Sequence, residues 1–226
     1  MTDKIVTAEE MRHYDSYTIN TIGIPSLVLM ERAALAVRDE ILHAFPIALK
    51  DVVVVAGSGN NGGDGIAIAR LLHIAGVHVA ILNIGNPQHA SAEHQTQEKI
   101  AHYYQIPETS DLTVLNKATL IVDAMFGIGI DRAVKGAYAD AINAINNTDA
   151  VVVAVDMPSG VNTDTGEVMG TAVKATTTVT FAYNKVGLTT NDGKDYAGNV
   201  VVANDMGTYA VDLLEYYLPS RFTINR

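Results

Sequence analysis

A glycine-rich run with two adjacent asparagines lies between a predicted strand and a predicted helix, and its spacing suits the binding of a phosphate group. Residues 57–65 read Gly-Ser-Gly-Asn-Asn-Gly-Gly-Asp-Gly. Glycines let backbone N–H groups approach a phosphate closely, and the helix that follows adds its positive N-terminal end. The run also matches the G-x-G-x-x-G dinucleotide fingerprint. The acidic residue expected about 20 positions later is absent, because no Asp or Glu lies between Asp64 and Glu93. Ordinary dehydrogenase-type NAD binding is therefore disfavoured.

Two carboxylates close apolar runs further along the chain. Asp123 follows Leu-Ile-Val and precedes the loop Ala-Met-Phe-Gly-Ile-Gly, and Asp156 follows Val-Val-Val-Ala-Val and precedes Met-Pro-Ser-Gly. A carboxylate at such a boundary either caps a loop or belongs to a site. The nearby Ser159 lacks the G-x-S-x-G context of a hydrolase nucleophile, and none of the seven histidines lies in these segments. Acyl transfer by a Ser-His-Asp triad is excluded on these grounds, and the histidines also lack zinc-site spacing.

Short β-branched runs alternate with helical patterns, which is typical of a parallel sheet covered on both faces. A capping box at Thr7 and Glu10 predicts a first helix to about residue 21, and a second starts at Pro25 and ends near Phe45. Strands are predicted at 52–56, 77–83, 120–123, 151–156, 177–182 and 199–203, and further helices at 62–75, 88–104, 136–146 and 208–216. We predict a Rossmann-like three-layer α/β/α sandwich with a mostly parallel central sheet and an N-terminal helix pair. Ligands of such sheets bind at the carboxyl ends of the strands, where the three polar segments lie.

Composition narrows the class of protein. The chain has 226 residues without a linker or a break in composition, so we expect one domain over 1–226. The formal net charge of -10 disfavours nucleic acid and anionic membrane partners. There is no cysteine, no apolar run approaches the ~20 residues of a membrane span, and the N-terminus does not resemble a signal peptide. We expect a cytoplasmic protein without disulfides or a thiolate metal site.

Taken together, the motifs resemble those of the NAD(P)H-hydrate epimerases, a domain also found as the N-terminal half of bifunctional nicotinamide-repair proteins. The resemblance covers essentially the whole chain. Beyond the polar segments, it includes Leu-Met-Glu-Arg-Ala at 29–33, Asp-Thr-Gly at 164–166 and Lys-Val-Gly-Leu at 185–188. The double-Asn glycine run combined with Asp-x-Pro-Ser-Gly is more specific than either motif alone. There is no room in 226 residues for the dehydratase half, so the resemblance implies the epimerase step alone, with a separate dehydratase as partner.

The resemblance also implies the site residues. It assigns a potassium ion to Asn61, Asp123 and Ser159, and catalysis to Asp156 and Lys185. The hydrated NADH or NADPH substrate would be contacted by Asn60, Asn61, Gly62, Gly63, Asp64, Gly127, Ile128, Gly129, Ile130, Asp131, Arg132, Ala133, Tyr138 and Asp156. An amide oxygen, a carboxylate and a hydroxyl are ligands that a hard monovalent cation accepts.

The expected reaction interconverts the R and S epimers of the hydrated nicotinamide ring. The lone pair of the ring nitrogen expels the neighbouring hydroxyl, and water adds again to either face of the iminium-like cation. The enzyme must shuttle a proton and stabilise positive charge. Asp156 is the candidate for both roles, but a potassium ion beside it would favour its ionised form, so water or Lys185 would then deliver the proton. Lys185 remains equally a candidate phosphate ligand or a solvated side chain.

Two alternatives remain. One is a non-catalytic dinucleotide sensor or scaffold, which would have no need of Asn61, Asp123, Asp156 and Ser159 together. The other is an NAD-dependent oxidoreductase, which the missing ribose carboxylate disfavours. We also expect a homodimer, for which the apolar N-terminal helix pair is the candidate surface.

Overall fold

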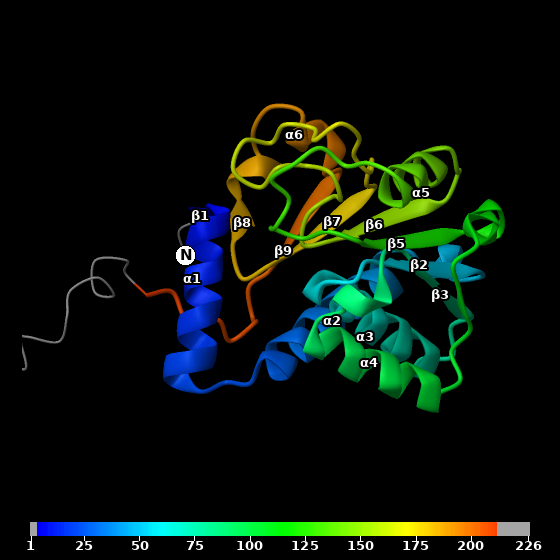
Figure 1. Cartoon of the computed structure of the whole chain (residues 1–226), viewed down its shortest axis with the longest axis horizontal. Coiled ribbons are helices and arrows are strands. Elements are labelled where there is room, and N and C mark those ends of the chain that lie inside the picture. The colour runs from blue at the N-terminus through cyan, green and yellow to red at the C-terminus, as the bar shows by residue number, and fades with distance from the viewer. Residues whose placement is uncertain (1–3, 212–226) are drawn as a thin grey trace, which may run out of the picture.

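Seven parallel strands form the central sheet of the protein, whose computed structural model describes residues 4–211. The strand order is β4-β3-β2-β5-β6-β7-β9, and every neighbouring pair is parallel (Figure 1). The strands are β2 (Val52–Ala56), β3 (Val79–Asn83), β4 (Glu108–Thr109), β5 (Leu120–Ala124), β6 (Val151–Val155), β7 (Thr177–Phe181) and β9 (Asn199–Ala203). The predicted three-layer α/β fold is confirmed, and the sheet is parallel throughout rather than mostly so.

Helices cover both faces of this sheet. In Figure 1, α2 (Ser26–Ala44), α3 (Asn60–Ile74) and α4 (Ala92–Tyr103) lie on one side, and α5 (Ala137–Asn146) and α6 (Gly193–Tyr196) on the other. Two hydrophobic clusters correspond to the two layers, one containing Val54, Ile68 and Ile81 and the other Val55 and Ile142. All five residues of β2 are buried, because side chains on both faces of a central parallel strand meet helices.

The N-terminal segment forms a separate wall beside the sheet. Strand β1 (Ile5–Val6) pairs in parallel with β8 (Asn184–Lys185), and α1 (Ala8–Tyr17) follows directly. The predicted capping box is present, with the Thr7 hydroxyl accepting from the Glu10 N–H and the Glu10 carboxylate accepting from the Thr7 N–H. After α1 the chain makes a π-helical turn over Thr18–Ile22 and turns at Gly23, whose φ is +90°.

Several predicted boundaries were wrong. The end of the first helix is not among them, because the helical chain runs to Ile22, with α geometry to Tyr17 and π geometry after it. Helix α4 begins at Ala92 rather than 88 because Ser91 caps it, its hydroxyl accepting from the His94 N–H. A short 3₁₀ turn precedes α4 at Pro87–His89. Conversely, α3 begins at Asn60, two residues earlier than predicted. The short strands β1, β4 and β8 and the helix α6 were not predicted, because elements of two to four residues carry no measurable periodicity.

The predicted C-terminal helix at 208–216 falls mostly outside the described residues. Its first part, 208–211, is irregular in the structure. Within residues 4–211, no helix has the length and apolar character required to cross a membrane.

Candidate active site

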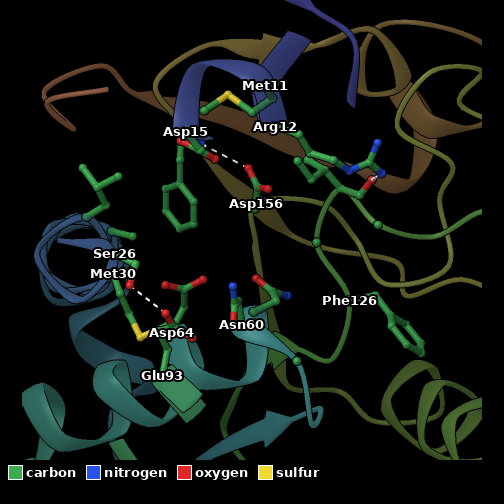
Figure 2. Close-up of a pocket in the computed structure, with 18 of the residues that line it drawn as sticks. Met11, Arg12, Asp15, Ser26, Met30, Asn60, Asp64, Glu93, Phe126 and Asp156 are labelled. Atoms are coloured by element: carbon green, nitrogen blue, oxygen red, sulfur yellow. Dashed lines mark hydrogen bonds between the residues drawn. The ribbon is translucent and has the colours of Figure 1, made fainter. Parts of the chain in front are cut away.

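A cavity of about 610 Å³ opens at the carboxyl ends of the central strands, between the sheet and the N-terminal wall. Figure 2 shows α1 contributing Met11, Arg12 and Asp15 along one side, while Asn60 and Asp64 of α3 face them from the other. Carboxyl ends of parallel strands meet at one edge of a sheet, where loops and helix N-termini form ligand sites. The cavity therefore lies where the sequence predicted the site.

The glycine-rich run wraps tightly around the start of α3. A Cβ on Gly62 would lie 1.7 Å from the Gly57 carbonyl oxygen, and a Cβ on Gly57 would lie 2.3 Å from the Met125 carbonyl oxygen. Only glycine fits at either position, so the run packs directly against the segment after β5. Gly62 and Gly63 are buried within α3, and Gly63 packs against Met30 of α2 and His94 of α4. Asn60, Asn61 and Asp64 line the cavity.

Asp156 and Lys185 form a buried ion pair at the wall of the cavity. The Lys185 ammonium lies 2.6 Å from Asp156 Oδ1 and also donates to the Phe181 carbonyl oxygen at 2.7 Å. The Lys185 side chain is 0% exposed, so the prediction of a solvated side chain was wrong. The Asp156 side chain retains 12% exposure, on the side of the cavity. The pair thus presents one carboxylate edge to a bound ligand while its counter-ion is excluded from solvent.

The backbone of Asp156 is unusual. Its φ is +68°, in the left-handed region that non-glycine residues rarely occupy. The conformation is held by the Asp156 N–H donating to the Val179 carbonyl oxygen at 2.8 Å. Asp156 Oδ1 additionally accepts from the Thr180 hydroxyl at 3.1 Å and the Phe181 N–H at 3.3 Å. Such strain is retained where surrounding contacts over-determine it, commonly at functional sites.

Asp123 of β5 and Ser159, in the turn after β6, lie together beneath the cavity. The Ser159 hydroxyl donates to Asp123 Oδ1 at 2.6 Å, and the Ser159 N–H donates to Oδ2 at 2.8 Å. Burial raises the pKa of Asp123 to about 6, although the hydrogen bonds from Ser159 and the Met125 N–H lower it. Neither side chain is exposed. The carboxylate therefore holds the loop after β5 against the turn after β6.

Asn61 carries an unsatisfied amide close to this pair of strand ends. Both its side-chain oxygen and nitrogen are buried without a hydrogen-bond partner among the described residues. A Cβ on Gly127 would lie 3.5 Å from Asn61 Oδ1 and 3.4 Å from Asp156 Oδ2, so both groups flank the same loop. Because an unpaired buried amide costs roughly 1–3 kcal/mol, Asn61 is a candidate to bind a ligand at this site.

Three further carboxylates line the cavity, those of Asp15, Asp64 and Glu93, and the sequence reasoning assigned only Asp64 to the site. Asp15 of α1 was not singled out, because nothing in its local sequence distinguishes it from a surface helix residue. Burial, and then the negative charge of Asp156, raise the pKa of Asp15 to about 6, against the opposing effect of Lys185. Burial and the charges of Asp156 and Asp15 hold the pKa of Asp64 well above its ordinary value. Four acids, Asp15, Asp64, Glu93 and Asp156, thus line one cavity together with the buried Lys185.

The predicted substrate loop divides between two cavities. Gly127, Ile128 and Gly129 line the main cavity. Ile130, Asp131, Arg132 and Ala133 line a neighbouring cavity of about 510 Å³, which shares Phe126, Gly129 and Tyr138 with the first. Phe126 and Tyr138 pack ring against ring, with centroids 4.5 Å apart. The two cavities therefore border each other at these rings.

Comparison with known proteins places these features in a family. Residues 26–187 match the family model described as YjeF-related protein N-terminus. The chain is 97% identical over 212 residues to the NAD(P)H-hydrate epimerase of Limosilactobacillus reuteri strain DSM 20016, covering 94% of this chain and 100% of that protein. It is 66% identical over 209 residues to the enzyme of the same name from Limosilactobacillus fermentum, covering 92% and 100%. The crystal structure of the yeast protein YNL200c has the same fold, with a TM-score of 0.76, 22% identity, and coverage of 88% of this chain and 87% of that one.

Proposed function

This chain belongs to the YjeF N-terminal family of NAD(P)H-hydrate epimerases, a class of isomerase, and on that premise we propose that it interconverts the R and S epimers of hydrated NADH and NADPH at the cavity between α1 and α3. The observation that carries the proposal is the Asp156–Lys185 pair, whose carboxylate edge opens on that cavity. The size of the cavity, about 610 Å³, suits a hydrated nicotinamide ring with its ribose.

Asp156 supplies negative charge where the ring becomes cationic. When the ring nitrogen expels the neighbouring hydroxyl, positive charge develops on the ring, and a fixed carboxylate nearby lowers the energy of that state. Lys185, Thr180 and the Phe181 N–H all donate to Asp156 Oδ1, so the carboxylate need not reorient during the reaction. All three donors contact Oδ1, so Oδ2 accepts no hydrogen bond among the described residues and is left for the substrate.

The rest of the dinucleotide is assigned to the two cavities and the glycine-rich run. The N-terminus of α3 offers positive potential to the phosphates, with Asn60, Asn61 and Asp64 as polar contacts. The loop from Gly127 to Ala133 would border the ligand, and Tyr138 would lie between the two cavities. The backbone amides of the run suit a site in a protein whose net charge of -10 repels anions at long range.

We further propose that a potassium ion binds near Asn61, Asp123 and Ser159. The unpartnered Asn61 amide oxygen and the fully buried Asp123 carboxylate fit an oxygen-ligated cation. No Lys, Arg or His within residues 4–211 forms an ion pair with Asp123, so its buried charge lacks a counter-ion from that part of the chain. When bound, such an ion would add positive charge beside the phosphates of the substrate.

The proposed activity is tested by mixing the purified protein with one separated epimer and following the other by chiral chromatography. We expect equilibration by the wild type and a loss of about 10²-fold or more for Asp156→Asn, which keeps the shape of the side chain and removes its charge. Retained turnover in Asp156→Asn would remove that residue from the reaction. If the epimers stabilise the wild type against heat but are not interconverted, the protein is a sensor rather than an enzyme.

The potassium site has its own test. Replacing potassium by tetramethylammonium is expected to lower both activity and thermal stability, whereas Asn61→Ala should make the protein indifferent to the exchange. Equal melting temperatures of the wild type in the two salts would argue against the ion.

We also propose a homodimer and a separate NAD(P)H-hydrate dehydratase as functional partner in the cytoplasm. Exposed apolar side chains at Ile22, Leu27 and Val28 support the N-terminal helix pair as the contact surface between copies. Size-exclusion chromatography with light scattering tests the dimer, and a coupled assay with a dehydratase specific for one epimer tests the partnership.

A further inference from the structure

The proposed reaction requires a proton donor, and Asp156 is poorly suited to that role. Its Oδ1 accepts hydrogen bonds from the Lys185 ammonium, the Thr180 hydroxyl and the Phe181 N–H. Three donors, one of them charged, hold Oδ1 as a hydrogen-bond acceptor. The group that protonates the departing hydroxyl must therefore be sought elsewhere around the cavity.

Lys185 is committed to other partners. Its ammonium is buried between Asp156 Oδ1 and the Phe181 carbonyl oxygen, at 2.6 and 2.7 Å, and the side chain is 0% exposed. Release of a proton from Lys185 would leave Asp156 as a buried charge without its counter-ion, which is energetically costly. Lys185 therefore positions and neutralises Asp156.

Other polar side chains around the cavity are also occupied. The Arg12 guanidinium does not lose its proton in proteins and donates to the Ile128 carbonyl oxygen. Glu93 accepts from the Ser26 hydroxyl at 2.6 Å, at the far end of the cavity in Figure 2. Tyr138 lies on the Phe126 side, near Ser58. The acids that remain are Asp15 and Asp64.

Asp15 lies beside Asp156 at the α1 end of the cavity, as Figure 2 shows. Its contact with the Thr208 hydroxyl, at 3.5 Å, is long and weak, so the carboxyl group is free to contact a ligand. The capping box at Thr7 and Glu10 and the pairing of β1 with β8 hold α1 in this place. A free acid next to a fixed carboxylate is the arrangement in which one group holds a proton while the other stays ionised.

We propose that Asp15 is the proton donor of the epimerisation, a role that rests on the proposed function of the cavity. The ring nitrogen lone pair forms a C=N bond as the C–O bond of the hydrated carbon breaks. The Asp15 carboxyl proton passes to the departing hydroxyl, which leaves as water. Addition of water to the opposite face breaks the C=N bond and returns the electron pair to nitrogen. The proton that this water loses passes to solvent, and Asp15 regains a proton from solvent, so the enzyme ends in its starting state.

The charges around Asp15 support this assignment. The groups facing it are Asp156 after β6, Lys185 of β8, Asp64 of α3 and the Thr208 hydroxyl. Burial and Asp156 raise the pKa of Asp15 to about 6, which outweighs the effect of Lys185. An acid with a pKa near neutrality both gives and regains a proton efficiently. Because the protonated form starts the reaction, the rate should fall about tenfold per pH unit above the pKa.

The test compares Asp15→Asn, Asp15→Glu and the exposed control Asp149→Asn with the wild type, using one purified epimer of hydrated NADH from pH 5 to 9. We expect Asp15→Asn to lower kcat by about 10²- to 10³-fold with KM within about threefold, and to lose the fall in rate at high pH. Asp15→Glu should restore part of kcat, and its rate should begin to fall at a different pH. Asp149→Asn should match the wild type. If the role of Asp15 were purely structural, the pH at which the rate begins to fall would be the same in Asp15→Glu as in the wild type.

The outcomes separate this inference from the proposed function. Wild-type turnover combined with an unchanged kcat and pH profile in Asp15→Asn overturns the role of Asp15 alone. If Asp64→Asn loses the fall in rate at high pH and Asp15→Asn keeps it, Asp64 is the proton donor, and the role of Asp15 is likewise overturned. Absence of turnover by the wild type overturns the proposed function, and the role of Asp15 with it.

Discussion

Replacing Lys185 by Met removes the counter-ion of Asp156 and should destabilise the protein strongly. The Lys185 side chain is 0% exposed, and its ammonium makes two short hydrogen bonds, to Asp156 Oδ1 and the Phe181 carbonyl oxygen. Met has a similar length and fills the apolar part of the space. The Asp156 carboxylate is then left 12% exposed with only the Thr180 hydroxyl and the Phe181 N–H as donors.

The magnitude follows from the burial of the pair. Removing one partner of a buried ion pair costs about 3–5 kcal/mol, because the remaining charge is left uncompensated. In a protein of this size, that corresponds to a fall of roughly 6–20 °C in melting temperature. The double variant Lys185→Met with Asp156→Asn removes both charges, so its loss should be smaller than the sum of the single losses by about 2 kcal/mol or more.

Urea unfolding of the wild type, both single variants and the double variant measures this coupling. The exposed Lys194→Met serves as a matched control and should change the free energy of unfolding by less than about 0.5 kcal/mol. Losses that add to within about 0.5 kcal/mol would refute the reasoning, since they would mean that the two charges do not depend on each other.

Three other changes have outcomes that the structure predicts. Gly62→Ala places a Cβ 1.7 Å from the Gly57 carbonyl oxygen and should lower the melting temperature by roughly 5 °C or more and weaken substrate binding. Differential scanning fluorimetry measures the melting temperature, and KM reports the binding. Wild-type values for both would contradict the packing of the glycine-rich run. Ser159→Ala removes the 2.6 Å hydrogen bond to buried Asp123 and should cost about 1–3 kcal/mol in urea unfolding, with Ser159→Thr as a comparison that keeps the hydroxyl. Asp15→Asn should stabilise the protein by about 2 kcal/mol at pH 8 and by little at pH 4. The pKa of the Asp15 carboxyl rises from 3.8 to about 6 on folding, so this carboxyl increasingly destabilises the folded state as the pH rises above 3.8. Solvent in the cavity reduces the full effect. Equal thermal stability of Asp15→Asn and wild type at pH 8 would show that the carboxyl is not desolvated.

Local sequence patterns were sufficient for the layers of the fold and for the place of the candidate site at one edge of the sheet. The apolar runs ending at Asp123 and Asp156, separated by helical patterns, predict neighbouring parallel strands, and the register confirms that Asp123 pairs with Ala154 at the same edge of the sheet. The glycine-rich run predicts a close approach to a phosphate, which stays a prediction; the structure shows that its Gly57 packs against the Met125 carbonyl. These features are readable because strand periodicity, turn chemistry and the direction of a parallel sheet are local or follow from simple topology.

The partners of the central carboxylate were decided by the tertiary structure alone. The sequence left Lys185 equally a phosphate ligand, a proton donor or a solvated side chain, and only its burial against Asp156 distinguishes among them. Asp15 gave no local signal, because a carboxylate on a capped amphipathic helix is ordinarily a surface residue. Its elevated pKa arises from packing α1 against the sheet, through the pairing of β1 with β8. Desolvation and charge proximity depend on which distant elements meet, and that is a property of the folded chain rather than of any segment of it.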